Sequence, residues 1–377
     1  MKLLHLSDLH LGKRFKEFPL LEDQAYILQV ILGIADVERP DAVLIAGDVY
    51  DRPTPSTEAV ELLDHFLVAL AQREIPVLLA SGNHDSPERL AFGAQLLEKS
   101  QIHIAPVYNG TVTPVTLQDA YGPVDIYLLP FLKPLYVRRC FPEEEIQDCT
   151  EAVACAIAHM DINPARRNVL AAHQFVIGAE RCDSEEISVG GSDQVDVSAF
   201  APFDYVALGH LHGPQDLDGG RVRYCGTPLK YSFSEIRHKK SVTLVELGPK
   251  GERTIRPILL TPLRDMVERR GTFQELFSAP RLPQDQEAYI HVVLTDEEDV
   301  PNAMERLRTI YPNVMGLDYD NRRTRSGDFC MGSANMVQQS PLDLFAAFYE
   351  QQNGAPLTEE QRRYLTAKIE EIQEVKE

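Results

Sequence analysis

The sequence predicts an α/β protein with two packed sheets, a small second domain and a helical tail. Over the first two thirds of the chain, short apolar segments alternate with segments of helical periodicity, which is the pattern of a layered α/β domain. The last strands of this part, 222–225 and 241–247, follow one another and indicate a second sheet. After residue 248 the pattern changes to a smaller unit.

The first eighty residues predict three strands joined by two helices. The strands are expected at 2–7, 42–46 and 76–80, and the helices at 20–37 and 57–72. Ser56 stands where the N-cap of the second helix is expected. Because the strands are short and almost entirely apolar, both faces of their sheet are expected to be buried.

The rest of the chain predicts further strands and then two smaller parts. Strands are expected at 125–129, 168–172, 205–208, 222–225 and 241–247, a linker at 257–262, a β-α-β unit at 288–294, 300–310 and 314–319, and helices at 341–352 and 358–375. The domains are therefore expected at 1–248 and 257–330, with a tail at 341–377.

The composition is that of a globular protein with a strongly acidic balance. Hydrophobic residues make up 44% of the 377 residues, and no run is long and apolar enough for a transmembrane helix. The start of the chain is too short and too soon charged for a signal peptide, and the six cysteines form no C-x-x-C pair, which predicts a cytoplasmic protein with reduced thiols. The net charge of −20 is unusual for an autonomous nucleic-acid binder.

Polar clusters follow five of the predicted strands. Their members are Asp, His and Asn, without thiolates: Asp8, His10, Asp48, Asp51, Asn83, His84, Asp85, His173, His210 and His212. Open α/β sheets place their ligand sites at this end of the strands. Carboxylate, imidazole and amide ligands suit divalent Mn, Fe or Zn. Each cluster alone could be a strand-end cap or a turn, but five in this order favour one metal centre.

These motifs, D-x-H, G-D-x-x-D, G-N-H-D, a lone His and G-H-x-H, resemble the calcineurin-like metallophosphoesterase superfamily over roughly residues 1–245. Within it the chain is similar to bacterial nuclease subunits that act with a coiled-coil ATPase. The stretches that carry this similarity are 6–12, 46–51, 205–212, 223–229 and 232–235. The resemblance implies an α/β/β/α metallophosphoesterase core, a small α/β capping domain and a helical tail.

The resemblance also implies the residues of a two-metal site. One divalent ion would be held by Asp8, His10, Asp48 and His212, and the second by Asp48, Asn83, His173 and His210. Mn²⁺ is the expected metal, with Mg²⁺, Fe²⁺ or Zn²⁺ as alternatives. His84 resembles the catalytic histidine of the superfamily. Asp85 is expected either to orient His84 or to cap a helix over 86–97.

A further set of basic residues could contact phosphate or a DNA backbone: Arg52, Arg322, Arg323 and Arg325. For each of them the alternative is a solvated surface charge. Asp51 stands where archaeal and eukaryotic relatives carry a second histidine, a position at which bacterial members resemble this chain.

The expected function is a metal-dependent DNA nuclease, with exonuclease activity on double-stranded ends and endonuclease activity on hairpins or single strands. The resemblance implies a role in DNA repair and recombination with a coiled-coil ATPase, as a homodimer within a heterotetramer. A small-molecule or cyclic-nucleotide phosphodiesterase on the same site is the alternative, and a non-enzymatic scaffold is a third reading. The parts beyond residue 248 favour the nuclease, since a small substrate needs neither a second domain nor a docking tail.

The tail carries an apolar stripe that has to be buried somewhere. Its members are Leu342, Leu344, Phe345, Phe348, Tyr349, Leu357, Tyr364, Leu365 and Ile369. Packing on the chain's own domain and docking on the base of the partner's coiled coil both remain open.

Overall fold

The computed structural model describes residues 1–182, 185, 193–280, 282–322, 324, 345, 346, 349 and 356–374. Its Cα positions form two compact units. The first comprises Met1–Val293 and Pro301–Asp318, and the second comprises Leu294–Val300 together with the chain from residue 319 onward. Among the described residues, no helix has the length and apolar character needed to cross a membrane.

The first sheet of the large unit has six strands in the order β16-β15-β1-β4-β5-β6. Their bounds are β1 Lys2–Leu6, β4 Ala42–Ala46, β5 Val77–Ala80, β6 Ile102–Ile104, β15 Ser241–Leu247 and β16 Arg253–Leu259. Strands β1, β4, β5 and β6 are parallel, and β15 joins β1 in the antiparallel sense. The carboxyl ends of β1, β4 and β5 therefore lie at one edge of this sheet.

The second sheet also has six strands, in the order β13-β14-β12-β9-β8-β7. Their bounds are β7 Val115–Asp119, β8 Gly122–Leu129, β9 Arg167–His173, β12 Tyr205–Gly209, β13 Gln215–Leu217 and β14 Val222–Tyr224. Strands β8, β9, β12 and β14 are parallel, while β7 and β13 are antiparallel edge strands.

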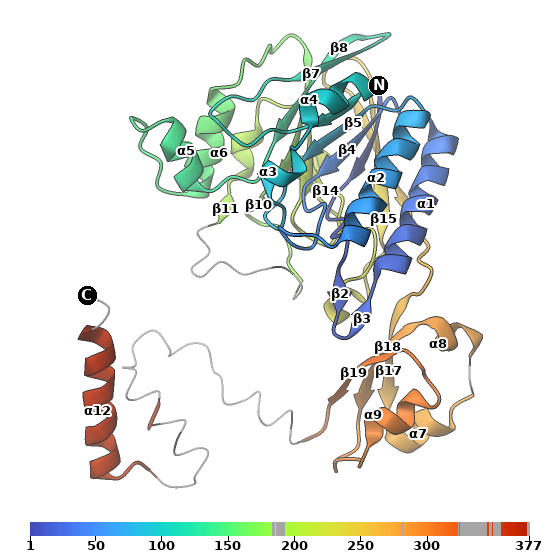
Figure 1. Ribbon diagram of the computed structural model, residues 1–377, viewed down its shortest axis with the longest axis vertical. Helices are drawn as coiled ribbons and strands as arrows, with labels where there is room; N and C mark the ends of the chain where they lie inside the picture. Colours follow the sequence, from blue (N-terminus) through green and yellow to red (C-terminus); the bar gives the residue numbers. More distant parts are fainter. Residues whose placement is uncertain are drawn as a thin grey trace. The chain divides into compact units, whose positions relative to one another are not determined.

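Three apolar layers show how the two sheets pack (Figure 1). Buried residues of α1 (Leu21–Glu38) and α2 (Thr57–Gln72) cover the outer face of the first sheet, and those of α5 (Pro134–Cys140) and α6 (Cys149–Ala158) cover the second. A third cluster, with Leu44 and Ala207 among its members, lies between the sheets. The expected α/β/β/α arrangement is confirmed. So is the cap at Ser56, whose Oγ accepts a hydrogen bond from Ala59 N at 3.3 Å.

Shorter elements connect the strands of the large unit. They are the hairpin β2 Arg14–Phe15 and β3 Phe18–Pro19, the helices α3 Pro87–Leu90 and α4 Ala94–Leu97, the strands β10 Phe175–Val176 and β11 Gln194–Val195, and the 3₁₀ helices η1 Glu98–Ser100, η2 Val197–Phe200, η3 Asp218–Gly220 and η4 Phe233–Glu235. The single helix expected over 86–97 is thus two short ones.

The small domain is a three-stranded sheet in the order β17-β18-β19 with short helices. Its elements are β17 Met266–Gly271, α7 Phe273–Ser278, α8 Pro283–Glu287, β18 Tyr289–Leu294, α9 Ala303–Arg308 and β19 Val314–Tyr319. The expected β-α-β unit is present. The linker expected at 257–262 is wrong in part, because 257–259 belong to β16.

The tail contains α12, Glu359–Glu374, which matches the last expected helix. Of the other expected tail helix, only 345, 346 and 349 are described, and all three are helical. Leu342, Leu344 and Phe348 of the apolar stripe lie outside the described residues. Phe345 and Tyr364 are 43% and 64% exposed.

Candidate metal centre

All seven side chains expected as metal ligands lie beyond the carboxyl ends of parallel strands. Asp8 and His10 follow β1, Asp48 follows β4 and Asn83 follows β5, whereas the three histidines end or follow strands of the second sheet: His173, His210 and His212. Ligand atoms of Asp8, His10 and His212 lie within 4.8 Å of one another, and so do those of Asp8, Asp48 and His173. The site thus draws on both sheets.

The backbone at these positions is strained. Asp8, His10, Asp48 and His210 have φ of 53°, 45°, 48° and 106°, a region that residues with a Cβ atom rarely adopt. Such conformations cost free energy and persist where the surrounding structure enforces them, commonly at functional sites. Here the loops are held by hydrogen bonds from Asp8 N to the Gly47 carbonyl at 3.0 Å and from His10 N to the Asp48 carbonyl at 2.9 Å.

A glycine makes the close approach of the loops possible. A Cβ atom on Gly82 would lie 2.1 Å from Asp48 Oδ1, so no larger residue fits beside that carboxylate. The glycine next to Asn83 in the G-N-H-D motif is therefore required by packing against the G-D-x-x-D motif.

One group of donor atoms surrounds Asn83. Its Oδ1 lies 2.9 Å from His173 Nε2 and 3.0 Å from His210 Nδ1. The same His173 Nε2 is 3.2 Å from Asp48 Oδ2. An amide oxygen, a carboxylate and two imidazole nitrogens thus face a common point, which is a donor set that holds a divalent ion.

A second group of donor atoms lies around His10. His10 Nε2 is 3.2 Å from His212 Nε2 and 3.7 Å from Asp48 Oδ2. Asp8 Oδ2 is buried and has no hydrogen-bond partner. The two facing nitrogens, His10 Nε2 and His212 Nε2, can form a hydrogen bond only if one of them carries a proton. A buried carboxylate oxygen without a hydrogen-bond partner, such as Asp8 Oδ2, lowers the stability of the fold. A bound cation would satisfy all of these atoms, so the residues fit the metal that the motifs imply.

The protonation states of the metal-free site are strongly perturbed. Burial raises the pKa of Asp8 to about 6 and lowers that of His210 to about 3. Burial opposes the charge of His173, but the carboxylates of Asp48 and Asp8 raise its pKa to about 9. Asp48 is likewise buried, yet the neighbouring His173 holds its pKa well below the usual range. Clusters of perturbed groups mark functional sites, and metal binding here would displace protons.

His84 lies beside the proposed ligands. Its ring centroid is 4.9 Å from that of His10, and its backbone N donates to Asp48 Oδ1 at 2.9 Å. Its Nδ1 is 3.0 Å from the Asp51 carbonyl oxygen. Because a carbonyl only accepts, this contact puts the proton on Nδ1 and leaves Nε2 as the unprotonated nitrogen of a neutral ring.

Asp85 braces two loops of the site. Its carboxylate accepts hydrogen bonds from Val49 N at 3.1 Å, Tyr50 N at 2.9 Å and Gly82 N at 2.9 Å, so its side chain ties the loop after β4 to the loop after β5. The expected N-cap role is wrong, because the N-cap of α3 is Ser86. No hydrogen bond joins Asp85 to His84 in the described part of the chain, and its role in orienting His84 stays a prediction.

Two buried partners of the ligands fix imidazole orientations. His173 Nδ1 lies 2.9 Å from the Ala46 carbonyl, and His212 Nδ1 lies 3.1 Å from Glu235 Oε1. Such partners set the tautomer and basicity of a metal-binding histidine. The motifs do not assign Glu235 a role. Its only sequence signal is membership of the 232–235 stretch that carries the resemblance.

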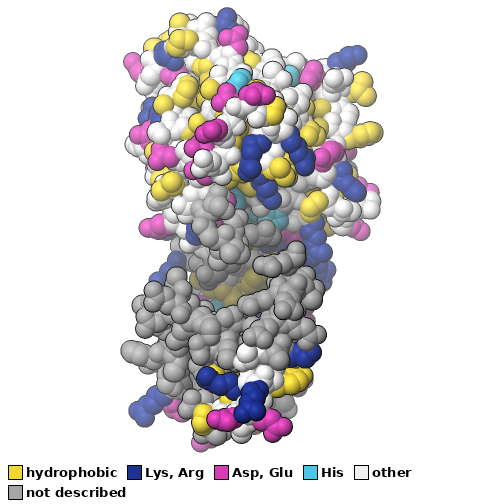
Figure 2. Space-filling model, turned by 90° about the vertical axis from the view of Figure 1, so that its left-hand side faces the viewer, with side chains coloured by type: hydrophobic (Ala, Val, Ile, Leu, Met, Phe, Trp, Pro, Cys, Tyr) yellow, Lys and Arg dark blue, Asp and Glu magenta, His cyan; other side chains and the backbone are white. Residues whose placement is uncertain are grey.

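Two of the expected basic contacts, Arg52 and Arg322, are described, and both side chains are exposed. The Arg52 side chain is 77% exposed, with Nε 3.8 Å from Asp51 Oδ2. Arg322 belongs to the second unit, where its side chain is 92% exposed and 3.8 Å from Glu297. Arg323 and Arg325 lie outside the described residues. On the face shown in Figure 2, Lys and Arg side chains are interspersed with Asp and Glu.

Residues 1–214 match the calcineurin-like phosphoesterase family. Since this match covers more than half of the chain, the chain belongs to that family, in agreement with the α/β/β/α core and the centre at its strand ends. Residues 262–353 match a second family, described as the type 5 capsule protein repressor C-terminal domain.

Curated relatives define the subfamily. A protein of Staphylococcus saprophyticus, named as the D component of the nuclease SbcCD, is 33% identical over 98% of this chain and 99% of its own length. Its namesake in Staphylococcus epidermidis is 32% identical over 84% of this chain and 85% of its own length. The chain therefore belongs to the SbcD family. A solved dimetal phosphatase from Danio rerio aligns over 70% of this chain and 98% of its own, with 11% identity and a TM-score of 0.38.

Proposed function

We propose that the chain is a metal-dependent DNA nuclease, a phosphodiesterase that works with the coiled-coil ATPase SbcC in DNA repair and recombination. The observation that carries the proposal is the gathering of the seven expected ligands in two adjoining groups of donor atoms, with His84 near His10 and Asp48. Its membership of the SbcD family supports DNA as the substrate. The expected activities are exonuclease action on double-stranded ends and endonuclease action on hairpins or single strands.

The proposed ligand sets follow the two groups of donor atoms. Asp8, His10 and His212 would hold one ion, and Asn83, His173 and His210 the other. Asp48 would bridge them, since its Oδ2 lies 3.7 Å from His10 Nε2 and 3.2 Å from His173 Nε2. We assign Mn²⁺ to the site, with Mg²⁺, Fe²⁺ or Zn²⁺ as alternatives, since carboxylate, amide and imidazole donors suit divalent metals of this kind. Bound in this way, two divalent ions supply an activated water and stabilise charge that develops on the phosphate.

The protein's own contribution to the chemistry is assigned to His84. The Asp51 carbonyl holds the ring by Nδ1, so Nε2 is left to face the substrate. An imidazolium at this position would donate to a phosphate oxygen in the transition state or protonate the leaving oxygen. Asp85 keeps the loop of His84 fixed through three backbone amides.

The remaining parts of the chain are proposed to serve recognition and assembly. Residues 1–248 would form the nuclease domain, 257–330 the capping domain and 341–377 a helical tail that docks on the coiled coil of SbcC. We place the protein in the cytoplasm, as a homodimer within a heterotetramer. Arg52, Arg322, Arg323 and Arg325 remain candidate phosphate contacts.

An assay with two substrates tests the function. The purified chain with Mn²⁺ is given a hairpin or nicked DNA and, separately, a chromogenic phosphodiester, with His84→Gln as the matched control. Cleavage of DNA that His84→Gln loses supports the nuclease. Cleavage of the small ester alone supports the small-molecule phosphodiesterase, and cleavage of neither supports the scaffold.

A further inference from the structure

A single turn of 3₁₀ helix, η4, bears two side chains that point to different parts of the molecule. Glu235, at its end, contacts the metal centre, and Phe233, at its start, contacts the small domain. Only one residue separates them along the chain.

The Glu235 end of the turn belongs to a buried polar network. Glu235 is fully buried, and its Oε1 lies 3.1 Å from His212 Nδ1. Its other oxygen pairs with Lys240 Nζ and accepts from Thr227 Oγ1 at 3.2 Å. Lys240 Nζ also donates to the His212 carbonyl at 2.9 Å and to Thr227 Oγ1 at 2.6 Å. Networks of this kind, fully satisfied, hold one arrangement rigidly.

The network fixes the state of His212. Glu235 forms an ion pair with Lys240. A carboxylate in an ion pair only accepts hydrogen bonds, so its contact with His212 places the proton of that imidazole on Nδ1. The lone pair of Nε2 is then directed at His10 and the proposed metal.

The Phe233 end of the turn is held by the small domain. Its ring stacks on His291 of β18, with centroids 4.0 Å apart and planes at 6°. On its other side it meets Phe15 of β2 edge to face at 4.9 Å. A Cβ atom on Gly316 of β19 would lie 2.5 Å from Phe233 Cε2, so the strand leaves room for the ring only because that residue is glycine.

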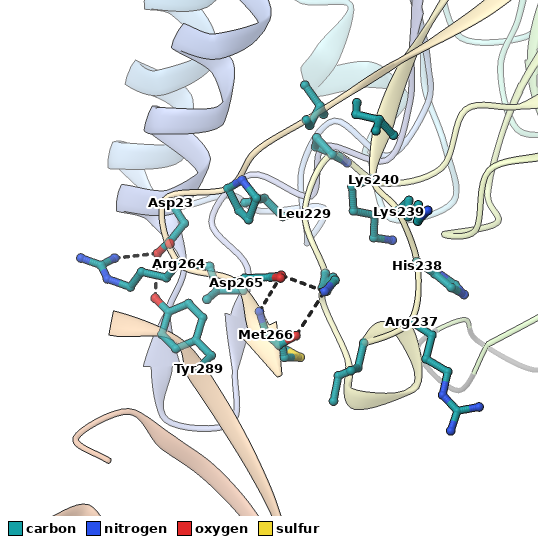
Figure 3. Close-up of a pocket in the computed structure, with 17 residues that line it drawn as sticks. Asp23, Leu229, Arg237, His238, Lys239, Lys240, Arg264, Asp265, Met266 and Tyr289 are labelled. Carbon is teal, nitrogen blue, oxygen red and sulfur yellow. Dashed lines mark hydrogen bonds and ion pairs between the residues drawn. The ribbon is translucent and has the colours of Figure 1, made fainter. Parts of the chain in front are cut away.

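Further contacts fasten the start of the small domain next to η4. Arg264 Nη1 and Tyr289 Oη both bond Asp23 Oδ2, at 2.8 and 2.7 Å, and Lys230 Nζ pairs with Asp265 at 2.8 Å (Figure 3). These residues line a cavity of about 400 Å³ whose wall also includes Lys240. Lys240, a member of the Glu235 network, therefore lines the same cavity as residues of the small domain.

We infer that η4 couples the small domain to the metal centre. In this arrangement Glu235 is a positioning residue for His212, and the stacking of Phe233 on His291 sets the position of Glu235. The inference rests on the proposed metal-binding role of His212, but not on which substrate is cut.

Mn²⁺ affinity, measured by calorimetry on the full chain, tests the coupling through a double-mutant cycle. Glu235→Ala is expected to weaken Mn²⁺ binding about 10- to 100-fold, the usual loss for an outer partner of a metal ligand. Phe233→Ala alone is expected to weaken Mn²⁺ binding less than Glu235→Ala does. Added to Glu235→Ala, it is expected to have no further effect on Mn²⁺ affinity, because both changes act through one contact.

Two variants separate coupling from general damage. His291→Ala removes the same stack from the other domain and is expected to reproduce the effect of Phe233→Ala. Phe277→Ala removes a ring from another stack of the small domain, with Phe273 at 5.4 Å, and is expected to bind Mn²⁺ as the parent does. Glu235→Gln keeps an acceptor for His212 and is expected to recover part of the affinity that Glu235→Ala loses.

Three results would contradict the coupling between the small domain and the metal centre. Parental Mn²⁺ affinity in Glu235→Ala would remove the positioning role. An effect of Phe233→Ala that persists undiminished in Glu235→Ala, or no effect of Phe233→Ala on a folded chain, would remove the link to the small domain. If the parent binds two Mn²⁺ but leaves DNA intact, the proposed nuclease function fails while the cycle still decides the coupling.

Discussion

Asp48 Oδ2 and His173 Nε2 lie 3.2 Å apart, although Asp48 follows β4 of the first sheet and His173 ends β9 of the second. The metal centre therefore forms only when the two sheets are packed against each other. The apolar layer between the sheets sets this spacing, so the same core that stabilises the domain also assembles the site.

Replacement of Asp48 by Ala is expected to remove both metal ions. Its Oδ2 lies near both groups of donor atoms, and it is the carboxylate that the proposed ligand sets assign to both ions. Asp8→Ala is the matched control, because Asp8 lies in one proposed set only, and it should leave part of the second ion bound. Elemental analysis of the purified variants measures this. Two metals per chain in Asp48→Ala would contradict the bridging role.

Replacement of His84 by Gln is expected to keep two metals and the fold but to slow DNA cleavage. The loss should be about 10²–10⁴-fold, the range for a missing acid–base group, because the proposed ligand sets leave His84 out and its hydrogen bond to Asp48 comes from the backbone N. Cleavage rate and metal content are measured on the same sample. A parallel fall of both would instead make His84 a ligand.

Replacement of Asp85 by Ala is expected to lower the free energy of unfolding by about 1–3 kcal/mol, because buried amides of Val49 and Gly82 lose their acceptor. Denaturant unfolding of the metal-free chain measures it. Asp36→Ala is the control: its carboxylate is 54% exposed and pairs with Arg73, so its loss should change the free energy by about 0.5 kcal/mol or less. Equal effects of the two would contradict the bracing role.

The sequence predicted which side chains gather at the site because each stands at a strand end. Asp8, Asp48 and Asn83 stand in short motifs, and the parallel strands before them are continuous apolar runs, so the shared edge follows from topology. Glu235 carried no such signal, because its partner His212 lies 23 residues away and η4 has no periodicity. The N-cap expected at Asp85 was wrong because Ser86 takes that position, whereas the side chain of Asp85 turns to the loop after β4.

Several strands were not predicted from the sequence, and the reasons are physical. β6, β7 and β13 are short or half-exposed strands, which lack a continuous apolar run. The end of β16, residues 257–259, was interpreted as part of a linker because of Pro257. However, β16 is the edge of its sheet, where proline is tolerated because the free side needs no N–H donor.

Truncation before residue 341 is expected to abolish association with SbcC and to spare Mn²⁺-dependent cleavage by the chain. The described part of the tail, α12, leaves Tyr364 64% exposed, and an amphipathic helix docks by its apolar face. Co-purification of the truncated chain with SbcC measures association, and the full chain is the control. Full recovery of the complex would assign docking to another surface.

Duplex DNA binding by the isolated chain is expected to be weak. The net charge is −20, and two divalent ions offset only a small part of it. Affinity for DNA comes mainly from neutralising phosphates and releasing counterions, and the basic residues on the visible face alternate with acidic ones. For the chain alone we expect a dissociation constant of about 10⁻⁴ M at physiological salt, the weak end of the non-specific range.

The ATPase would supply most of the affinity for DNA and deliver the DNA end to the metals. A salt titration of DNA binding by the chain and by its complex with SbcC measures how much of the DNA affinity each protein contributes. Tight and steeply salt-dependent binding by the chain alone would instead reveal a basic surface, with the segment around Arg322 as the first to mutate.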